Sequence, residues 1–212
     1  DENKVDGNPW DIKFLAMFHM SNDSGLFRDA RRRGELAVPV RLYEAKLVHQ
    51  FDHRWATYVG DGDESRDMTD AEKVDASKGV QPRYWLDESE GIDRLNSRSL
   101  PLQWAIGYRD ICRNTDMRTL ISAAIPTMAV DGGFPLLFPL AQSNLRGTSC
   151  ALLIGNFNAL VCDYVVRQKA TGAHLKYFHV RQLPVLRYDG YSDDEQLAIV
   201  SRVLELSYTA ND

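Results

Sequence analysis

The sequence has few cysteines, and none is spaced for a metal site or a disulfide framework. Cys112, Cys150 and Cys162 form no C-x-x-C pair and leave one thiol over. This pattern argues against a zinc knuckle and favours a reducing compartment, where disulfides are rare. We expect all three to be buried as small hydrophobic side chains.

Long hydrophobic runs are also missing. The most apolar segment, CALLIGNFNALVCDYVV at 150–166, includes Asn156, Asn158 and Asp163. Because a membrane span needs about 20 mostly apolar residues, we expect a buried helix here, in a cytoplasmic protein without a membrane partner. The chain opens with DENKVDGNPW, which has neither the basic nor the apolar region of a secretory leader, so we interpret it as part of a longer polypeptide.

Complete catalytic motifs are absent as well. The sequence has no glycine-rich phosphate loop and no G-x-S-x-G elbow, and GNPW at 7–10 lacks the second proline of an N-P-P-[YF] tetrapeptide. His49 and His53 have the spacing of the H-E-x-x-H motif, but Gln50 replaces its general base. We therefore expect no catalytic residue, metal site or cofactor in this chain.

Negative charge is concentrated in one segment. Residues 61–75, DGDESRDMTDAEKVD, hold seven acids and two bases, which accounts for the whole net charge of −5. The rest of the chain is neutral and contains basic clusters, so net charge does not exclude a polyanionic partner. We predict a mobile acidic loop at about 60–80.

The order of the predicted elements favours one α+β domain over residues 1–212. Strands are expected within 12–20 (or a short helix there), into Tyr43 from 38, and at 104–113, 119–130 (broken at Pro126), 134–140 and 182–187. One helix is expected over 150–166, capped by Thr148 or Ser149 and ending near Gly172, and another over about 193–208. The prediction is a mixed, mostly antiparallel sheet with a buried helix and a C-terminal amphipathic helix.

Glu44 and Lys46 favour a second function, a metal-dependent nuclease. An E-x-K triplet after an apolar strand can bind Mg²⁺ through the acid and stabilise developing charge through the lysine. The same acid-x-Lys spacing recurs at Glu2 and at Asp11, so the triplet alone is weak support. This alternative requires another carboxylate within coordination reach of Glu44.

Basic and amide side chains also recur beside aromatic ones, which is typical of surfaces that bind nucleic acid. Such residues contact phosphates or base edges. Internal ion pairs, for instance Arg109 with Asp110 or Arg118 with Asp116, are the simpler interpretation of the arginines. The residues expected to face DNA are Lys46, His49, Gln50, His53, Arg54, Arg109, Arg113, Arg118, Lys169, His174 and Lys176.

Four segments together resemble the C-terminal target-recognition region of adenine-specific (N6) DNA methyltransferases of the type IIG and type ISP restriction–modification and phage-defence class. They are NPWDIKFLAMFHMSNDSGLFR (8–28), RLYEAKLVHQFDHRWATY (41–58), GYRDICRNTDMRTLISAAIP (107–126) and NFNALVCDYVVRQKATGAHLKYFHVRQLPVL (156–186). The resemblance covers most of residues 8–190.

The last segment is also similar to the recognition domains of type I restriction specificity subunits. Its features are Gly172, the Q-L-P-V stretch at 182–185 and the E-Q-L-A-I-V stretch at 195–200. The chain departs from that family at Arg187 and Tyr188, where prolines are usual, which puts the junction to the following helix in doubt.

The resemblance implies a module that reads double-stranded DNA in the major groove while a methyltransferase core flips and methylates an adenine. That core, the partner of this domain, would lie N-terminal to Asp1 and bind S-adenosylmethionine. A third function, a protein-interaction module, would be favoured by an apolar stripe exposed on 195–207.

Overall fold

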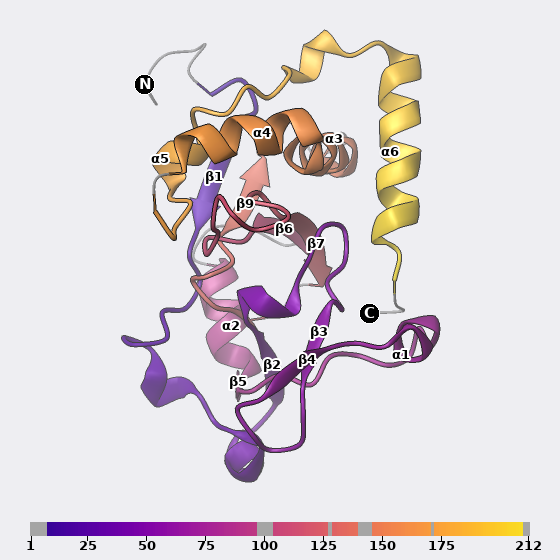
Figure 1. Cartoon of the computed structure of the whole chain (residues 1–212). Helices are drawn as coiled ribbons and strands as arrows, with labels where there is room; N and C mark the ends of the chain where they lie inside the picture. The colour runs from indigo at the N-terminus through magenta and orange to yellow at the C-terminus, as the bar shows by residue number, and fades with distance from the viewer. Residues whose placement is uncertain (1–7, 97–103, 127–128, 140–145, 171, 210–212) are drawn as a thin grey trace.

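The computed structural model describes residues 8–96, 104–126, 129–139, 146–170 and 172–209. It confirms the predicted α+β class (Figure 1). The strands are β1 (Ile12–Leu15), β2 (Pro39–Tyr43), β3 (Ala56–Tyr58), β4 (Ser65–Asp67), β5 (Trp85–Asp87), β6 (Trp104–Tyr108), β7 (Ser122–Pro126), β8 (Ala129–Val130) and β9 (Leu136–Pro139). The α-helices are α1 (Asp70–Val74), α2 (Glu88–Asn96), α3 (Arg146–Asn158), α4 (Leu160–Lys169), α5 (Tyr177–Val180) and α6 (Asp193–Ser207).

The strands form three sheets of different size. The largest has the order β1-β9-β6-β7 and is antiparallel throughout, whereas β3 and β4 form a separate antiparallel pair. The third sheet has the order β5-β2-β8, and within it β2 and β8 run parallel, with Leu42 opposite Ala129 and Tyr43 opposite Val130. The carboxyl ends of β2 and β8 therefore lie at the same edge of the sheet.

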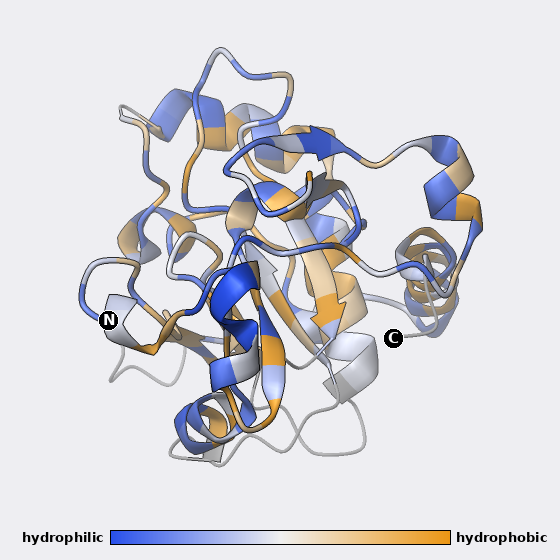
Figure 2. Ribbon diagram, turned by 90° about the horizontal axis from the view of Figure 1, so that it is seen from below, coloured by the Kyte–Doolittle hydropathy of each residue, from blue (hydrophilic) through white to orange (hydrophobic). Residues whose placement is uncertain are grey.

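Two hydrophobic clusters hold these layers together. One lies around β2, β8 and the residues that follow them, with Leu42, Tyr43 and Phe134 fully buried. The other lies between the four-stranded sheet and α3, which α4 and α6 flank (Figure 1). Gly155 allows α6 to approach α3 closely, since a Cβ there would lie 3.0 Å from Cγ2 of Ile199. Figure 2 shows hydrophobic residues along the central strands, whereas hydrophilic stretches recur on the outer helices and loops.

Of the two predicted helices, the first differs from the structure and the C-terminal one agrees with it. The helix predicted over 150–166 is two helices, because the chain leaves helical geometry at Ala159 and α4 bends 62° away from α3. The first of them begins at Arg146, before the predicted caps. The C-terminal helix is confirmed, and its Ser192 forms a capping box with Glu195.

Two other predicted elements are wrong. Residues 182–187 form no strand, because the chain that follows the short helix α5 is a turn and irregular structure here. The acidic segment is not one open loop, since β4 and α1 lie within it and Thr69 caps α1 through a capping box with Glu72. The three cysteines are buried and unbridged, as expected.

In the described part of the chain, no single helix is long and apolar enough to cross a membrane. The bent pair formed by Gly147–Asn158 and Leu160–Lys169 meets the criterion of length and composition only when both helices are taken together.

Candidate nucleic-acid interface

Three segments that are distant in sequence lie side by side and carry most of the predicted DNA-facing residues. They are the loop 47–54, the β6–β7 connection 109–121, and residues 167–170 with 172–176. Phe51 N donates to the Ser122 carbonyl at 3.2 Å, which joins the first segment to β7. Cys112 N donates to the Ala173 carbonyl at 3.0 Å, which joins the second segment to the third. We call the surface that these segments form the three-segment surface.

Asp110 organises the centre of this surface. Its carboxylate accepts a hydrogen bond from Nζ of Lys176 at 2.9 Å and lies 2.9 Å from Nδ1 of His174. Its backbone N–H donates to the Gly133 carbonyl, and its own carbonyl accepts from Leu175 N. The side chains of His174 and Lys176 remain about half exposed, so both are available at the surface.

The internal ion pairs considered from sequence do not form. Asp110 bonds to His174 and Lys176 instead of Arg109, and the Asp116 carboxylate accepts from the backbone N–H of Arg113. Among the residues that the structure describes, Arg109, Arg113 and Arg118 have no carboxylate within 4.0 Å of a guanidinium nitrogen. No direct ion pair with a described residue therefore neutralises these three arginines.

Arg109 and Arg118 each place part of the guanidinium group in the interior. Arg109 Nε and Arg118 Nη1 are buried and have no hydrogen-bond partner in the part of the chain that the structure describes. Burial lowers the pKa of Arg109, although a guanidinium stays charged near neutral pH. A buried donor without an acceptor costs about 1–3 kcal/mol, more when it is charged. The other nitrogens of each guanidinium are not fully buried, so an anion that binds them would offset part of this cost.

Arg167 is a supporting residue that the sequence prediction left out of the site. Its guanidinium bonds to the buried Asp163 carboxylate at 3.0 Å and donates to the carbonyls of Asn114, Asp116 and Met117. Asp163 in turn accepts from the backbone N–H groups of Thr119 and Leu120. The sequence signal for this arrangement was Asp163, a carboxylate inside an otherwise apolar helix. Asp163 and Arg167 together hold the β6–β7 connection in place.

The other predicted DNA-facing residues are held by contacts within the protein. His49 stacks on Trp55 with ring centroids 4.4 Å apart, and burial, followed by the charge of Arg109, lowers its pKa. Gln50 Nε2 donates weakly to the Asn158 carbonyl at 3.4 Å, and Lys169 Nζ donates to Gln182 at 3.3 Å. Lys46 lies 4.4 Å above the ring of Tyr58.

His53 and Arg54 were predicted to face DNA, but the structure places them in the interior. His53 is 5% exposed and Arg54 is fully buried. The Arg54 guanidinium donates to the carbonyls of Asp75, Lys78 and Lys73, and also to that of Thr209. These contacts join the end of the acidic segment and the C-terminal chain to the core, which is a structural role.

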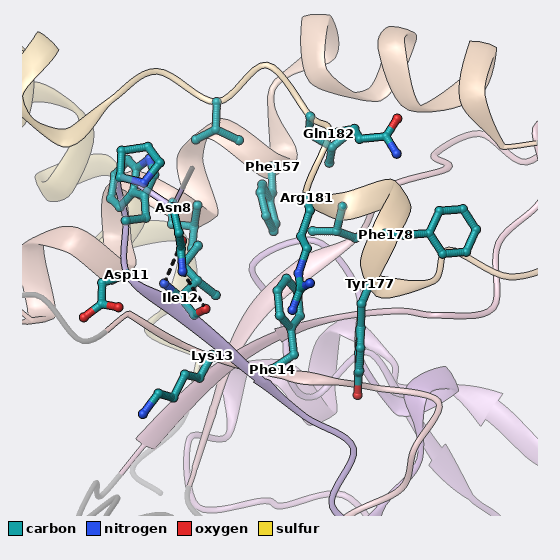
Figure 3. Close-up of a pocket in the computed structure, with 16 residues that line it drawn as sticks. Asn8, Asp11, Ile12, Lys13, Phe14, Phe157, Tyr177, Phe178, Arg181 and Gln182 are labelled. Atoms are coloured by element: carbon teal, nitrogen blue, oxygen red, sulfur yellow. Dashed lines mark hydrogen bonds between the residues drawn. The ribbon is translucent and has the colours of Figure 1, made fainter. Parts of the chain in front are cut away.

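A groove that the sequence did not predict adjoins the three-segment surface at α5. Its volume is about 770 Å³, and β1, α3 and the chain from Tyr177 to Val185 line it (Figure 3). Phe14 stacks against Tyr177 with ring centroids 4.8 Å apart, and the Arg181 guanidinium lies 5.3 Å from the Phe14 ring. Lys176, part of the three-segment surface, is the N-cap residue of α5.

Within the described ranges, no group of three or more His, Cys, Asp or Glu side chains has the arrangement of a metal site. The chain matches no model of a known protein family, and a search of curated proteins found no similar sequence.

Proposed function

We propose that this chain is a double-stranded DNA recognition domain of an adenine-N6 DNA methyltransferase that serves restriction–modification or phage defence. The observation that carries the proposal is the convergence of Arg109, Arg113 and Arg118 with His174 and Lys176 on one surface, together with buried guanidinium nitrogens that lack an acceptor. Phosphate oxygens are charged acceptors that suit guanidinium donors.

In this proposal the exposed and the half-buried residues take different roles in DNA binding. Arg113 and Lys176 are exposed and suit the phosphate backbone, which supplies affinity without sequence information. Gln50 and His49 are half-buried at the same surface and suit base edges, because fixed amide and imidazole groups discriminate between bases. In this proposal His53 and Arg54 make no contact with DNA.

The catalytic core would be supplied by the same polypeptide or by a cytoplasmic partner, and it would hold S-adenosylmethionine. A second surface supports such a contact. Leu197 and Leu204 lie seven residues apart on α6 and are 71% and 61% exposed, and Tyr208, its C-cap residue, is 75% exposed. These exposed apolar side chains support a protein contact here, and we assign that contact to the methyltransferase core.

Binding to random duplex DNA at low and moderate salt tests the proposal directly. The triple variant Arg109→Ala, Arg113→Ala and Arg118→Ala should bind far more weakly, and each lost phosphate contact should reduce the salt slope by about 1. Arg31→Ala is the matched control, since Arg31 is an exposed arginine outside the three segments. Equal binding by the triple variant and the control would contradict the proposal.

A further inference from the structure

β1 lies at an edge of the largest sheet, whose strand order is β1-β9-β6-β7. One side of β1 pairs with β9, and no strand in the described part of the chain pairs with its other side. Ile12, Lys13 and Phe14 of this strand line the groove at α5 (Figure 3). The edge of a strand can bind another chain when its backbone N–H and C=O groups are unpaired.

The backbone groups of Ile12 show which way the residues of β1 face. In an antiparallel pair, each residue directs its N–H and C=O to one side, and successive residues alternate. The side-chain amide of Asn8 accepts from Ile12 N at 3.0 Å and donates to the Ile12 carbonyl at 3.1 Å (Figure 3). Both groups of Ile12 therefore point away from β9, and those of Phe14, two residues further on, point the same way.

The opposite strand gives the same orientation independently. Tyr108 N donates to the carbonyl of Pro135, directly before β9, at 3.2 Å. Pro135 therefore faces β6, and the next residue, Leu136, faces β1, where it lies opposite Leu15. Because Leu15 pairs with β9 in this way, the residue before it, Phe14, directs its backbone groups to the outer edge.

The outer edge of β1 is capped at Ile12 and unpaired at Phe14. The Asn8 amide acts on Ile12 as one residue of a neighbouring strand would, because it supplies one acceptor and one donor. No hydrogen bond to a residue that the structure describes uses the N–H or the carbonyl of Phe14. A strand that continues from the position of the Asn8 amide would next pair with Phe14.

The groove beside this edge offers contacts for the side chains of such a strand. Leu153 and Phe157 of α3 are buried and give it an apolar floor. Lys13 and Arg181 are exposed at its rim, with one acid, Asp11, among the lining residues that the structure describes. The rim is therefore net positive and suits an acidic side chain.

We propose that the groove binds an extended peptide segment of a partner protein as an added strand on the edge of β1. Main-chain hydrogen bonds to Phe14 would supply affinity, and side chains at alternate positions would supply specificity. The apolar floor selects an apolar residue, and the charges of Lys13 and Arg181 select an acidic one beside it. This surface is separate from the exposed side chains of α6, and the proposal does not depend on DNA binding.

A single strand of nucleic acid fits the groove less well. Bases bind such grooves by stacking on aromatic rings, whereas Phe14 already stacks with Tyr177 and lies 5.3 Å from the Arg181 guanidinium. A nucleic-acid backbone also has no N–H donor for the Phe14 carbonyl.

Selection of random displayed peptides of about ten residues, the upper length of a typical strand, on the wild-type chain tests the proposal. The selected peptides should carry apolar residues at alternate positions and at least one acid. The best of them is then synthesised with a fluorescent label, and its affinity is measured by fluorescence anisotropy. Failure to enrich any such peptide on the wild type would overturn the proposal.

Phe14→Pro and Phe14→Val form a matched pair of variants. Both remove the ring, but only proline removes the backbone N–H, and proline is tolerated on an edge strand whose N–H faces outward. Phe14→Pro should bind the peptide at least about fivefold more weakly than Phe14→Val, the contribution of about one net hydrogen bond. Equal affinity of the two variants would contradict an added strand.

N-methylation of the peptide, one backbone nitrogen at a time, gives a second test that leaves the protein unchanged. Affinity should fall at alternate positions only, since only alternate N–H groups of an added strand face β1. Loss at no position, or at every position alike, would contradict strand addition. This series decides alone if circular dichroism shows that Phe14→Pro is unfolded.

Two further outcomes would assign the edge to another occupant. Dimerisation of the chain in sedimentation experiments that is lost in Phe14→Pro would overturn the proposal in favour of edge pairing between two copies. Binding of a single-stranded oligonucleotide that displaces the peptide and is lost in Phe14→Pro would overturn it in favour of nucleic acid.

Discussion

Arg54 and Arg109 are both arginines with buried guanidinium nitrogens, yet their surroundings differ. Carbonyls of Lys73, Asp75, Lys78 and Thr209 accept from the terminal nitrogens of Arg54, which leaves only its Nε without an acceptor. The Arg109 guanidinium makes no hydrogen bond to any residue that the structure describes. A buried cation whose donors are used inside the protein stabilises the fold. A buried cation whose donors have no acceptor lowers the stability of the fold but can still bind an anion. We interpret such a destabilising arginine as a sign that it belongs to the interface.

The largest expected effect on stability comes from removing Arg54, whose terminal guanidinium nitrogens are all hydrogen-bonded inside the protein. Arg54→Met should reduce the free energy of unfolding by at least about 3 kcal/mol, because several buried carbonyls lose a charged donor at once. Urea denaturation measures this change, and Arg31→Met provides the exposed control. A loss below about 1 kcal/mol would show that water replaces the guanidinium and that the contrast with Arg109 is weaker than we infer.

Asp131, a buried carboxyl group that directly follows β8, should make stability depend on pH. The pKa of Asp131, about 7, lies above its ordinary value of 3.8, so the folded state holds the proton more tightly than the unfolded state. This contribution is complete below pH of about 4 and is lost as the pH rises to about 7, a change of at most about 4 kcal/mol.

Two variants separate this effect from other titrations. Asp131→Asn should remove it, and Glu44→Gln should reduce it, because the charge of Glu44 is the second cause, after burial, of the raised pKa of Asp131. Thermal denaturation at pH values from about 4 to about 8 measures this dependence of stability on pH. An unchanged pH profile in Asp131→Asn would exclude Asp131 as its source.

The smallest effect on stability is expected at the exposed member of the arginine set. Arg113→Ala should change the free energy of unfolding by less than about 0.5 kcal/mol, since its guanidinium is at the surface. The salt slope of DNA binding should nevertheless fall by about 1. A change in stability without any change in the salt slope would place Arg113 in the fold instead of the interface.

Sequence patterns predicted the class of the fold and the last helix, because helical periodicity is a local signal. They could not predict the pairing of Asp110 with His174 and Lys176, which lie 64 and 66 residues further along the chain. The burial of Arg54 was hidden for the same reason, since its acceptors are backbone groups at 73–78 and at Thr209. The strand expected at 182–187 failed because its apolar residues pack as irregular chain beside the groove.

The most direct test of the central claim measures two quantities on one variant, Arg109→Met with Arg118→Met. We predict that its free energy of unfolding equals or exceeds that of the wild type, because two buried donors without acceptors are removed. We predict that its affinity for duplex DNA falls steeply, while Arg31→Met changes neither quantity. Loss of stability together with unchanged DNA affinity would contradict the account and make Arg109 and Arg118 structural residues like Arg54.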